Sequence, residues 1–142
     1  IKLFPDNPFS YVNLSNIFKD CNHLNEAEKY IKLAINLAPY NVDLLINLVN
    51  IFLHSSKFKD AERVLVKALV INSNHLAANR IYAGLLIDNQ RFEYAIFFLK
   101  KVLSIDPQLI DVYLSLSNIL EPLCTPPSLK IIASPASALK SN

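Results

Sequence analysis

The sequence is poor in the residue types from which many active sites are built. Its 142 residues include one glycine and neither methionine nor tryptophan, which leaves little room for the glycine-rich loops that cradle phosphates. Its two cysteines, Cys21 and Cys124, are too few and too far apart for a disulfide framework. We therefore expect a reducing compartment, with the cytoplasm as the default location.

Long apolar runs and strong charge are missing as well. Hydrophobic residues make up 52% of the chain, yet no stretch approaches the roughly eighteen uninterrupted apolar residues of a membrane span. The formal net charge of +2 is too small to indicate a nucleic-acid partner. We therefore expect no membrane and no nucleic-acid partner, and an RNA-reading helical repeat is disfavoured.

The chain has instead a repeat of 34 residues. Alanine recurs at Ala27, Ala61 and Ala95, each 34 residues after the last. A fixed period of this size is typical of a solenoid, in which each unit buries its apolar face by stacking on its neighbours. Other positions recur in the same register: Leu14, Leu48, Tyr82 and Leu116; Phe18, Phe52, Leu86 and Leu120; Ile31, Leu65 and Leu99.

Between turns rich in Asn, Ser and Pro, the apolar positions follow a helical period. Helices joined by turns this short run antiparallel. Only a methyl-sized side chain fits where two such helices cross closely, so we expect the recurring alanines to mark the crossings. The predicted helices are 8–21, 24–37, 42–55, 58–71, 76–89, 92–105 and 109–121.

The two ends of the chain depart from the pattern. Pro5 precedes Pro39 by one period, so we expect residues 1–7 to be the end of a preceding, truncated repeat, with further repeats upstream. After Asn118 the pattern fails because Pro122 disfavours helix. We expect the Pro- and Ser-rich residues 122–142 to be poorly ordered. The predicted units between are 8–41, 42–75, 76–109 and a partial fourth unit, 110–121.

This pattern resembles the tetratricopeptide repeat (TPR) family, whose unit is a helix–turn–helix with a small residue on each helix and a closing proline. Residues 8–107 resemble three such units, although Ser73 replaces the closing proline of the second. The resemblance implies an all-α, right-handed superhelical solenoid. The small residue of the first helix is Ser15, Val49, Ala83 and Ser117 in turn.

Paired asparagines around a leucine give a narrower resemblance, to the repeats of O-linked N-acetylglucosamine transferases and related bacterial multi-repeat proteins. In those relatives, asparagines of the inner helices line a concave groove and hold the backbone of an extended peptide. An amide suits this role because it offers two donors and an acceptor, whatever the peptide's side chains. The resemblance carries over to Asn13, Asn16, Asn47, Asn50 and Asn118, and fails in the third unit, at Ile81 and Gly84.

The predicted function is therefore that of a protein–protein interaction scaffold that binds an extended peptide segment in such a groove. We expect Val12, Ile46 and Ile87 to edge the groove, with Arg80 beside it. The alternative for the asparagines is that they cap or bridge helices and touch no ligand. The alternative function is a substrate-presenting arm of a larger, glycosyltransferase-like enzyme whose catalytic domain is absent from this chain.

A second type of TPR site, the carboxylate clamp for the acidic C-terminus of heat-shock chaperones, is incomplete. It needs two asparagines together with Lys or Arg, because a carboxylate prefers cations. Asn16 and Asn47 fit, but the cationic positions hold Val12, Ala77 and Ile81. We rank this site below the asparagine groove.

No catalytic residue, metal site or cofactor site is predicted. His23, His54 and His75 lie near turns of different units, without the spacing of metal ligands, and are expected to be solvated or capping residues. At the end of the array, an apolar face of Val112, Leu116 and Ile119 is expected to be open or covered by Leu129, Ile131 and Ile132. Because exposed repeat ends associate, we expect concentration-dependent self-association.

Overall fold

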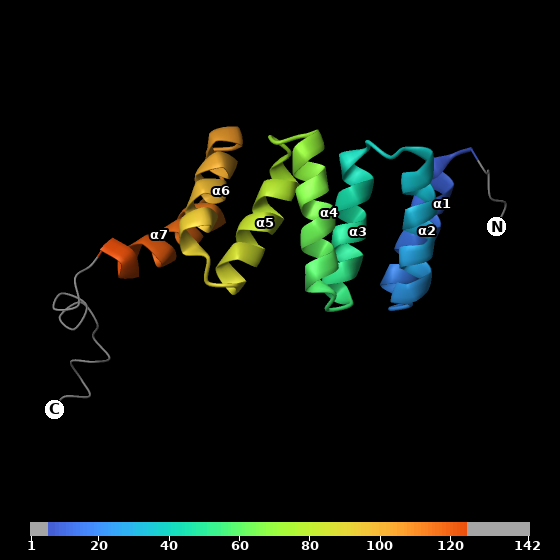
Figure 1. Ribbon diagram of the computed structural model, residues 1–142, viewed down its shortest axis with the longest axis horizontal. Helices are drawn as coiled ribbons and strands as arrows, with labels where there is room; N and C mark the ends of the chain where they lie inside the picture. The colour runs from blue at the N-terminus through green and yellow to red at the C-terminus, as the bar shows by residue number, and fades with distance from the viewer. Residues whose placement is uncertain (1–5, 125–142) are drawn as a thin grey trace, which may run out of the picture.

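The computed structural model describes residues 6–124, and within them it contains seven helices and no strand. Figure 1 shows the helices side by side in chain order, with α1 and α7 at opposite ends of the row. This open row without a single central core is a helical-repeat solenoid, which confirms the all-α prediction. The helices are α1 (Pro8–Asp20), α2 (Leu24–Leu37), α3 (Val42–His54), α4 (Phe58–Ile71), α5 (Leu76–Asp88), α6 (Phe92–Ile105) and α7 (Ile110–Cys124).

Helices α1 to α6 agree with the predicted ranges to within one residue at each end. Each has 13 or 14 residues. No helix within residues 6–124 is both long and apolar enough to cross a membrane.

Three residues join the two helices of each unit, and the middle one adopts a left-handed backbone. The φ angles are 63° at Asn22, 58° at Ser56 and 60° at Gln90. The next N–H then bonds to a carbonyl five residues earlier, as from His23 to Phe18 at 2.8 Å. Such turns satisfy carbonyl groups that the helix end leaves without partners. Side chains disfavour a left-handed backbone, yet this glycine-poor chain uses Asn, Ser and Gln there.

Side chains cap the first helices of the three complete units. The Oδ1 atoms of Asn7 and Asn41 each accept a hydrogen bond at 3.0 Å from the backbone N–H two residues on. His75 Nδ1 accepts one from the N–H of Ala78 at 3.2 Å. These bonds satisfy N–H groups that have no partner inside the helix. The expectation of a capping histidine is confirmed at His75.

The recurring alanines lie at the predicted helix crossings. Ala27, Ala61 and Ala95 are fully buried on the second helices of their units. At the first crossing the Ser15 hydroxyl is buried as well, and it donates a hydrogen bond to the carbonyl oxygen of Ala27 at 2.7 Å. That bond offsets the cost of burying a hydroxyl group. Small side chains therefore let the two helices of a unit approach closely.

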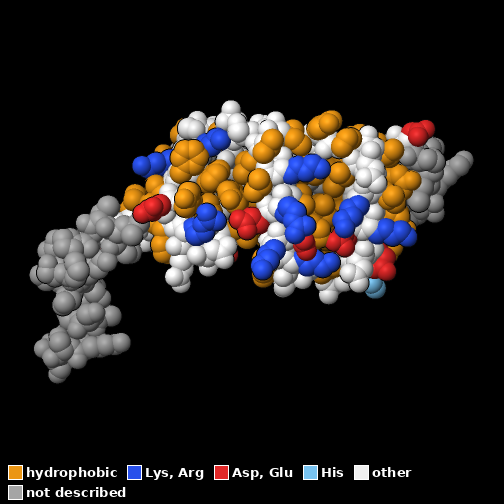
Figure 2. All heavy atoms as spheres, in the orientation of Figure 1, with side chains coloured by type: hydrophobic (Ala, Val, Ile, Leu, Met, Phe, Trp, Pro, Cys, Tyr) orange, Lys and Arg blue, Asp and Glu red, His pale blue; other side chains and the backbone are white. Residues whose placement is uncertain are grey.

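Ion pairs on the second helices follow the same period. Glu28 on α2 lies 3.5 Å from both Lys32 and Lys57, and Lys57 directly precedes α4, the second helix of the next unit. One period later, Glu62 lies 3.9 Å from Arg91. Figure 2 shows acidic and basic side chains interspersed on the face of the row that it presents. Each exposed pair contributes little, but the two pairs join consecutive units in the same way.

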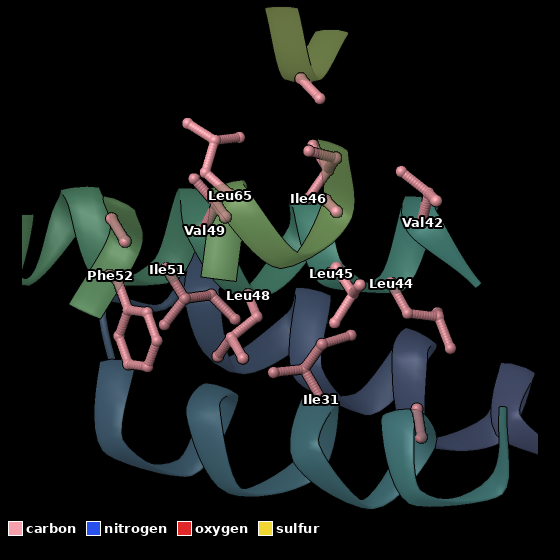
Figure 3. Close-up of a cluster of buried hydrophobic side chains, with 14 of the residues drawn as sticks. Ile31, Val42, Leu44, Leu45, Ile46, Leu48, Val49, Ile51, Phe52 and Leu65 are labelled. Atoms are coloured by element: carbon pink, nitrogen blue, oxygen red, sulfur yellow. The ribbon is translucent and has the colours of Figure 1, made fainter. Parts of the chain in front are cut away.

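α3, the first helix of the second unit, is covered by neighbouring helices on two sides. In Figure 3, one set of its apolar side chains points toward α2, where Ile31 lies, and another set points away, toward α4 and α5. Burial of each such side chain contributes about 1.5–3 kcal/mol, so the contacts with both neighbours stabilise this helix. The first set includes Leu44, Leu48 and Ile51, and the second includes Val42, Ile46 and Val49; all six are buried.

The buried apolar residues form two clusters that meet at α5. The first cluster extends from α2 to α5 and includes Ala78 and Leu85 of that helix. The second includes Ala83 and Leu86 of α5 together with residues of α6 and α7. α5 thus contributes to both clusters, and it couples the stability of the first two units to that of the third.

A buried asparagine compensates for the missing proline between α4 and α5. Asn79 is fully buried, and its Nδ2 donates hydrogen bonds to the carbonyl oxygens of Ser73, at 3.0 Å, and His75, at 2.7 Å. Its Oδ1 has no hydrogen-bond partner among the described residues. The amide holds the loop in which Ser73 stands in the place of the closing proline of the unit.

α7 differs from the prediction in length. The sequence predicts an end at residue 121, but the helix passes Pro122 and ends at Cys124. A proline in the last turn forfeits one hydrogen bond while its ring fixes φ close to the helical value, so the helix tolerates it there. One period after Gln90, whose backbone is left-handed, Cys124 is helical. The predicted disorder of residues 125–142 lies outside the described residues.

The apolar face that the sequence predicts at the end of the array is also only partly right. Val112 and Ile119 are buried in the second cluster, against residues of α6. They repeat the positions of Leu44 and Ile51, which pack against the preceding unit in the same way. Leu116 is half-buried, so of the three residues only Leu116 belongs to a face left open.

Candidate peptide-binding surface

Polar contacts link the first helices of successive units. The Nε2 atom of His75, the capping residue of α5, lies 3.0 Å from Asp43 Oδ1 on α3. Arg80 on α5 contacts Asp111 on α7. α3, α5 and α7 are therefore neighbours along one side of the solenoid, and the predicted groove residues lie on these three helices and on α1.

Two pairs of asparagines lie on the first two of these helices. Asn13 and Asn16 belong to α1, and Asn47 and Asn50 belong to α3; Asn13 is exposed and the other three are half-buried. Residues three apart share a helix face, so each helix presents one pair. Within residues 6–124 these four side-chain amides form no hydrogen bond, whereas Asn79 is held by two. Their donors and acceptors are thus available to water or to a ligand.

The third unit interrupts this arrangement. Asn118 on α7 is exposed, but α5 separates it from the pairs on α1 and α3 and carries Ile81 and Gly84 at the corresponding positions. A Cβ atom added at Gly84 would meet no other atom within 4 Å. The structure therefore leaves Asn118 apart from the other four asparagines and leaves open space beside α5.

The apolar residues predicted at the groove edge take different places. Ile46 is 7% exposed and belongs to the first core cluster, so its side chain offers almost no surface to a ligand. It points toward α4 and α5 (Figure 3), where the next unit covers it. Val12 and Ile87 are half-buried and pack against the two clusters, so part of each side chain stays accessible.

An exposed aromatic residue that is not among the predicted groove residues lies beside the first asparagine pair. Phe9 on α1 is 71% exposed. It precedes Asn13 by four residues and Asn16 by seven, a spacing that places all three on one helix face. The spacing is visible in the sequence. The sequence does not show, however, whether the helix face that carries Phe9 is buried or exposed.

The charges on the first helices do not fit an acidic ligand. The Arg80 guanidinium is occupied by Asp111, and Lys19 is the other cation on α1, α3, α5 and α7. A carboxylate-binding site needs several convergent cations. The exposed charges on these helices are mostly acidic: Asp20, Asp43, Asp88, Asp111 and Glu121.

A hollow of about 580 Å³ lies away from the asparagines, where the start of α4 meets the end of α5. Its walls include Lys57 and Glu62, which already form ion pairs between units. Within residues 6–124, no group of three or more His, Cys, Asp or Glu side chains could hold a metal ion.

Residues 10–41 match the tetratricopeptide repeat family. Among curated proteins, none matches this chain in sequence. Of the solved structures, the first TPR domain of Spaghetti (RPAP3) bound to the HSP90 peptide SRMEEVD has a TM-score of 0.75, at 20% identity over 87% of this chain and 100% of that one. The Arabidopsis OM64 TPR domain has a TM-score of 0.72, at 19% identity over 80% of this chain and 94% of its own.

A third similar structure is a tetratricopeptide repeat protein from Parabacteroides merdae, with a TM-score of 0.74 at 22% identity over 82% of this chain and 46% of that one. At such identities a structural match establishes the fold alone. The fold is an all-α helical repeat of the TPR type. Within it, residues 10–41 are a tetratricopeptide repeat by sequence as well. The narrower resemblance to glycosyltransferase repeats stays a prediction.

Proposed function

We propose that this chain is a protein-interaction module that holds an extended segment of a partner protein against α1 and α3. The observation that carries the proposal is the set of side-chain amides at Asn13, Asn16, Asn47 and Asn50, which form no hydrogen bond within residues 6–124. Asparagine is a poor helix former, so its repeated use at the same two positions calls for a reason outside the helix. A similar TPR structure is bound to a peptide, which supports a peptide as ligand.

The chemistry of the surface fits a ligand that is recognised mainly by its backbone. Each amide can accept a hydrogen bond from a peptide N–H and donate one to a peptide carbonyl. One neutral hydrogen bond contributes about 0.5–1.5 kcal/mol, so several are needed for useful affinity. Phe9 and Val12 add apolar contacts that favour some peptide side chains over others.

The peptide class differs from the one in the similar RPAP3 structure. The peptide SRMEEVD in that complex is acidic, whereas the first helices here carry a majority of acidic side chains. Like charges across an interface oppose binding. We therefore expect neutral or basic segments to bind in preference to acidic ones.

A peptide-library screen against the chain of residues 1–142, followed by titration of the best ligand, tests the proposal. Asn16→Ala with Asn47→Ala should lower affinity about tenfold or more, since each lost bond costs about 0.5–1.5 kcal/mol. Thermal stability should not fall, because alanine is the better helix former. The matched control is Asn25→Ala with Asn36→Ala, which changes exposed asparagines of α2 and should bind as wild type does.

Two results would contradict the proposal. If the first double variant binds as tightly as wild type, the asparagines of α1 and α3 do not contact the ligand. If it unfolds while the control does not, the asparagines have a structural role. The alternative of a substrate-presenting arm of a larger enzyme stays a prediction, and reading the parent gene for an adjoining catalytic domain tests it.

A further inference from the structure

α7 repeats an apolar face that is buried two units earlier, on α3. The 34-residue period assigns six residues of α7 to positions that are all buried on α3, where α2, α4 and α5 surround the helix. The pairs are Ile110 with Val42, Tyr113 with Leu45, Leu114 with Ile46, Leu116 with Leu48, Ser117 with Val49 and Leu120 with Phe52.

On α7 most of this face is open. Ile110 is 73% exposed, Leu114 60% and Tyr113 49%. Ser117 is exposed, although its counterparts at the helix crossings of the three complete units are buried. The face contains a shallow hollow of about 440 Å³, lined by Tyr113, Leu116, Ser117, Leu120 and Glu121.

The second unit shows what the outer part of this face binds. The counterparts of Ile110, Leu114 and Ser117 on α3 are Val42, Ile46 and Val49, which are buried and point toward α4 and α5 (Figure 3). The complement of the α7 face is therefore a helical segment with small and branched aliphatic side chains on one side. An aliphatic segment that follows α7 directly has the shortest loop to close.

We propose that residues 128–134 of this chain dock on the open face of α7, in place of the second helix of the fourth unit. In units one to three, three residues separate the first helix from the second. Residues 125–127 provide the same number between Cys124 and Ser128. With that connector a second helix would begin at Ser128, and the i, i+3, i+4 spacing of Leu129, Ile132 and Ala133 would place these three residues on one helix face.

Charge favours this occupant over a second copy of the chain. Glu121 at the rim of the hollow makes no ion pair with another described residue, and α7 carries no Lys or Arg. Residues 125–142 contain Lys130 and Lys140 and no acidic residue. A second α7 would bring another Glu121, and like charges in an interface oppose association. The docked segment would also remove apolar surface through which repeat ends associate.

Hydrogen exchange of the α7 amides in the chain of residues 1–142 tests the proposal, at dilutions where sedimentation velocity shows a monomer. Leu129→Asp with Ile132→Asp should speed exchange over residues 112–121 about tenfold or more, because protection reports local stability, and should promote self-association at higher concentration. The matched control, Ser137→Asp with Ser141→Asp, adds the same charge to the same part of the chain outside the docking segment. It should leave exchange unchanged.

A second, milder variant is needed in case the double Asp variant unfolds the whole chain. General unfolding would appear as faster exchange in α1 to α4 as well. Lys130→Glu should speed exchange of α7 about two- to fivefold, the scale of one exposed ion pair. The proposal fails if exchange over residues 112–121 is the same in wild type and all three variants. It also fails if wild-type protection of α7 falls on dilution together with the dimer, since a second copy then covers the face.

Discussion

The first two units and the remainder of the chain share one period and one packing scheme, yet their surfaces differ. On the first helices, α1 and α3 present asparagine pairs, whereas α5 has Ile81 and Gly84 in their place. On the outer side of the second helices, α6 exposes Tyr94 by 57% and Phe97 by 61%. The same positions in units one and two are charged: Glu26 and Lys29, then Asp60 and Arg63.

The 34-residue period constrains the buried positions and leaves the surface positions free to diverge. The alanine at each crossing is buried in all three units, because two helices leave no room there for a larger side chain. The outer positions meet only solvent, so a charge pair and an aromatic pair are both compatible with the fold. The peptide-binding proposal therefore rests on the first two units, and the docking proposal on the open end.

The largest expected effect is a loss of stability when the alanine at a helix crossing is enlarged, and it should differ between the second unit and the third. Ala61→Leu should destabilise the chain by about 1–3 kcal/mol, because the crossing of α3 and α4 has no space for a larger side chain and neighbouring units hold both helices. The corresponding Ala95→Leu should cost less, since α6 adjoins the incompletely covered α7 and can shift. Thermal unfolding followed by circular dichroism measures both. Equal midpoints for Ala61→Leu and wild type would mean that Ala61 does not mark a tight crossing.

A smaller effect is expected from extending the asparagine pairs into the third unit. Gly84 is exposed on α5 with open space beside it, so Gly84→Asn should be accommodated. It should tighten peptide binding about two- to tenfold, the scale of one added hydrogen bond. Gly84→Ala is the control: it should raise stability by up to about 1 kcal/mol through helix propensity and leave affinity unchanged. Equal affinities for the two variants would confine the binding surface to the first two units.

The smallest expected effect concerns the ion pairs between units. Glu28→Gln removes contacts with Lys32 and Lys57 and should lower stability by no more than about 1 kcal/mol, with the loss shrinking at high salt. Glu26→Gln is the control, because Glu26 is exposed and forms no ion pair with another described residue. Urea denaturation at low and high salt compares the two. A salt-independent loss for Glu28→Gln would show that packing, not charge, is responsible.

Much of the fold could be predicted because burial imposes the period on the sequence. The alanine register and the turn residues located α1 to α6 to within one residue at each end. The end of α7 was missed, because a proline in a last turn is compatible with helix although it disfavours helix elsewhere. The bonds from Asn79 to the loop that contains Ser73 were also missed, since an asparagine in a helix does not reveal its partner.

The candidate site was less predictable than the fold. The 34-residue period shows on which helix, and at which position of it, each predicted site residue lies. The exposure of its side chain depends on which neighbouring helix covers it. Ile46 was expected at the groove edge and is buried by the following unit, whereas Phe9 has no described unit before it and is exposed. Arg80 was expected beside the groove, but its partner Asp111, 31 residues away in the sequence, was not foreseen.

The most direct test of the central claim is the nuclear magnetic resonance spectrum of the side-chain amides during titration with the best peptide. If these amides hold the peptide, the NH₂ signals of Asn13, Asn16, Asn47 and Asn50 shift in proportion to the peptide bound. Amide signals of second helices, such as Asn36 on α2, should stay in place. Shifts confined to the second helices, or to α6 and α7, would contradict the central claim and move the binding surface away from the asparagine pairs.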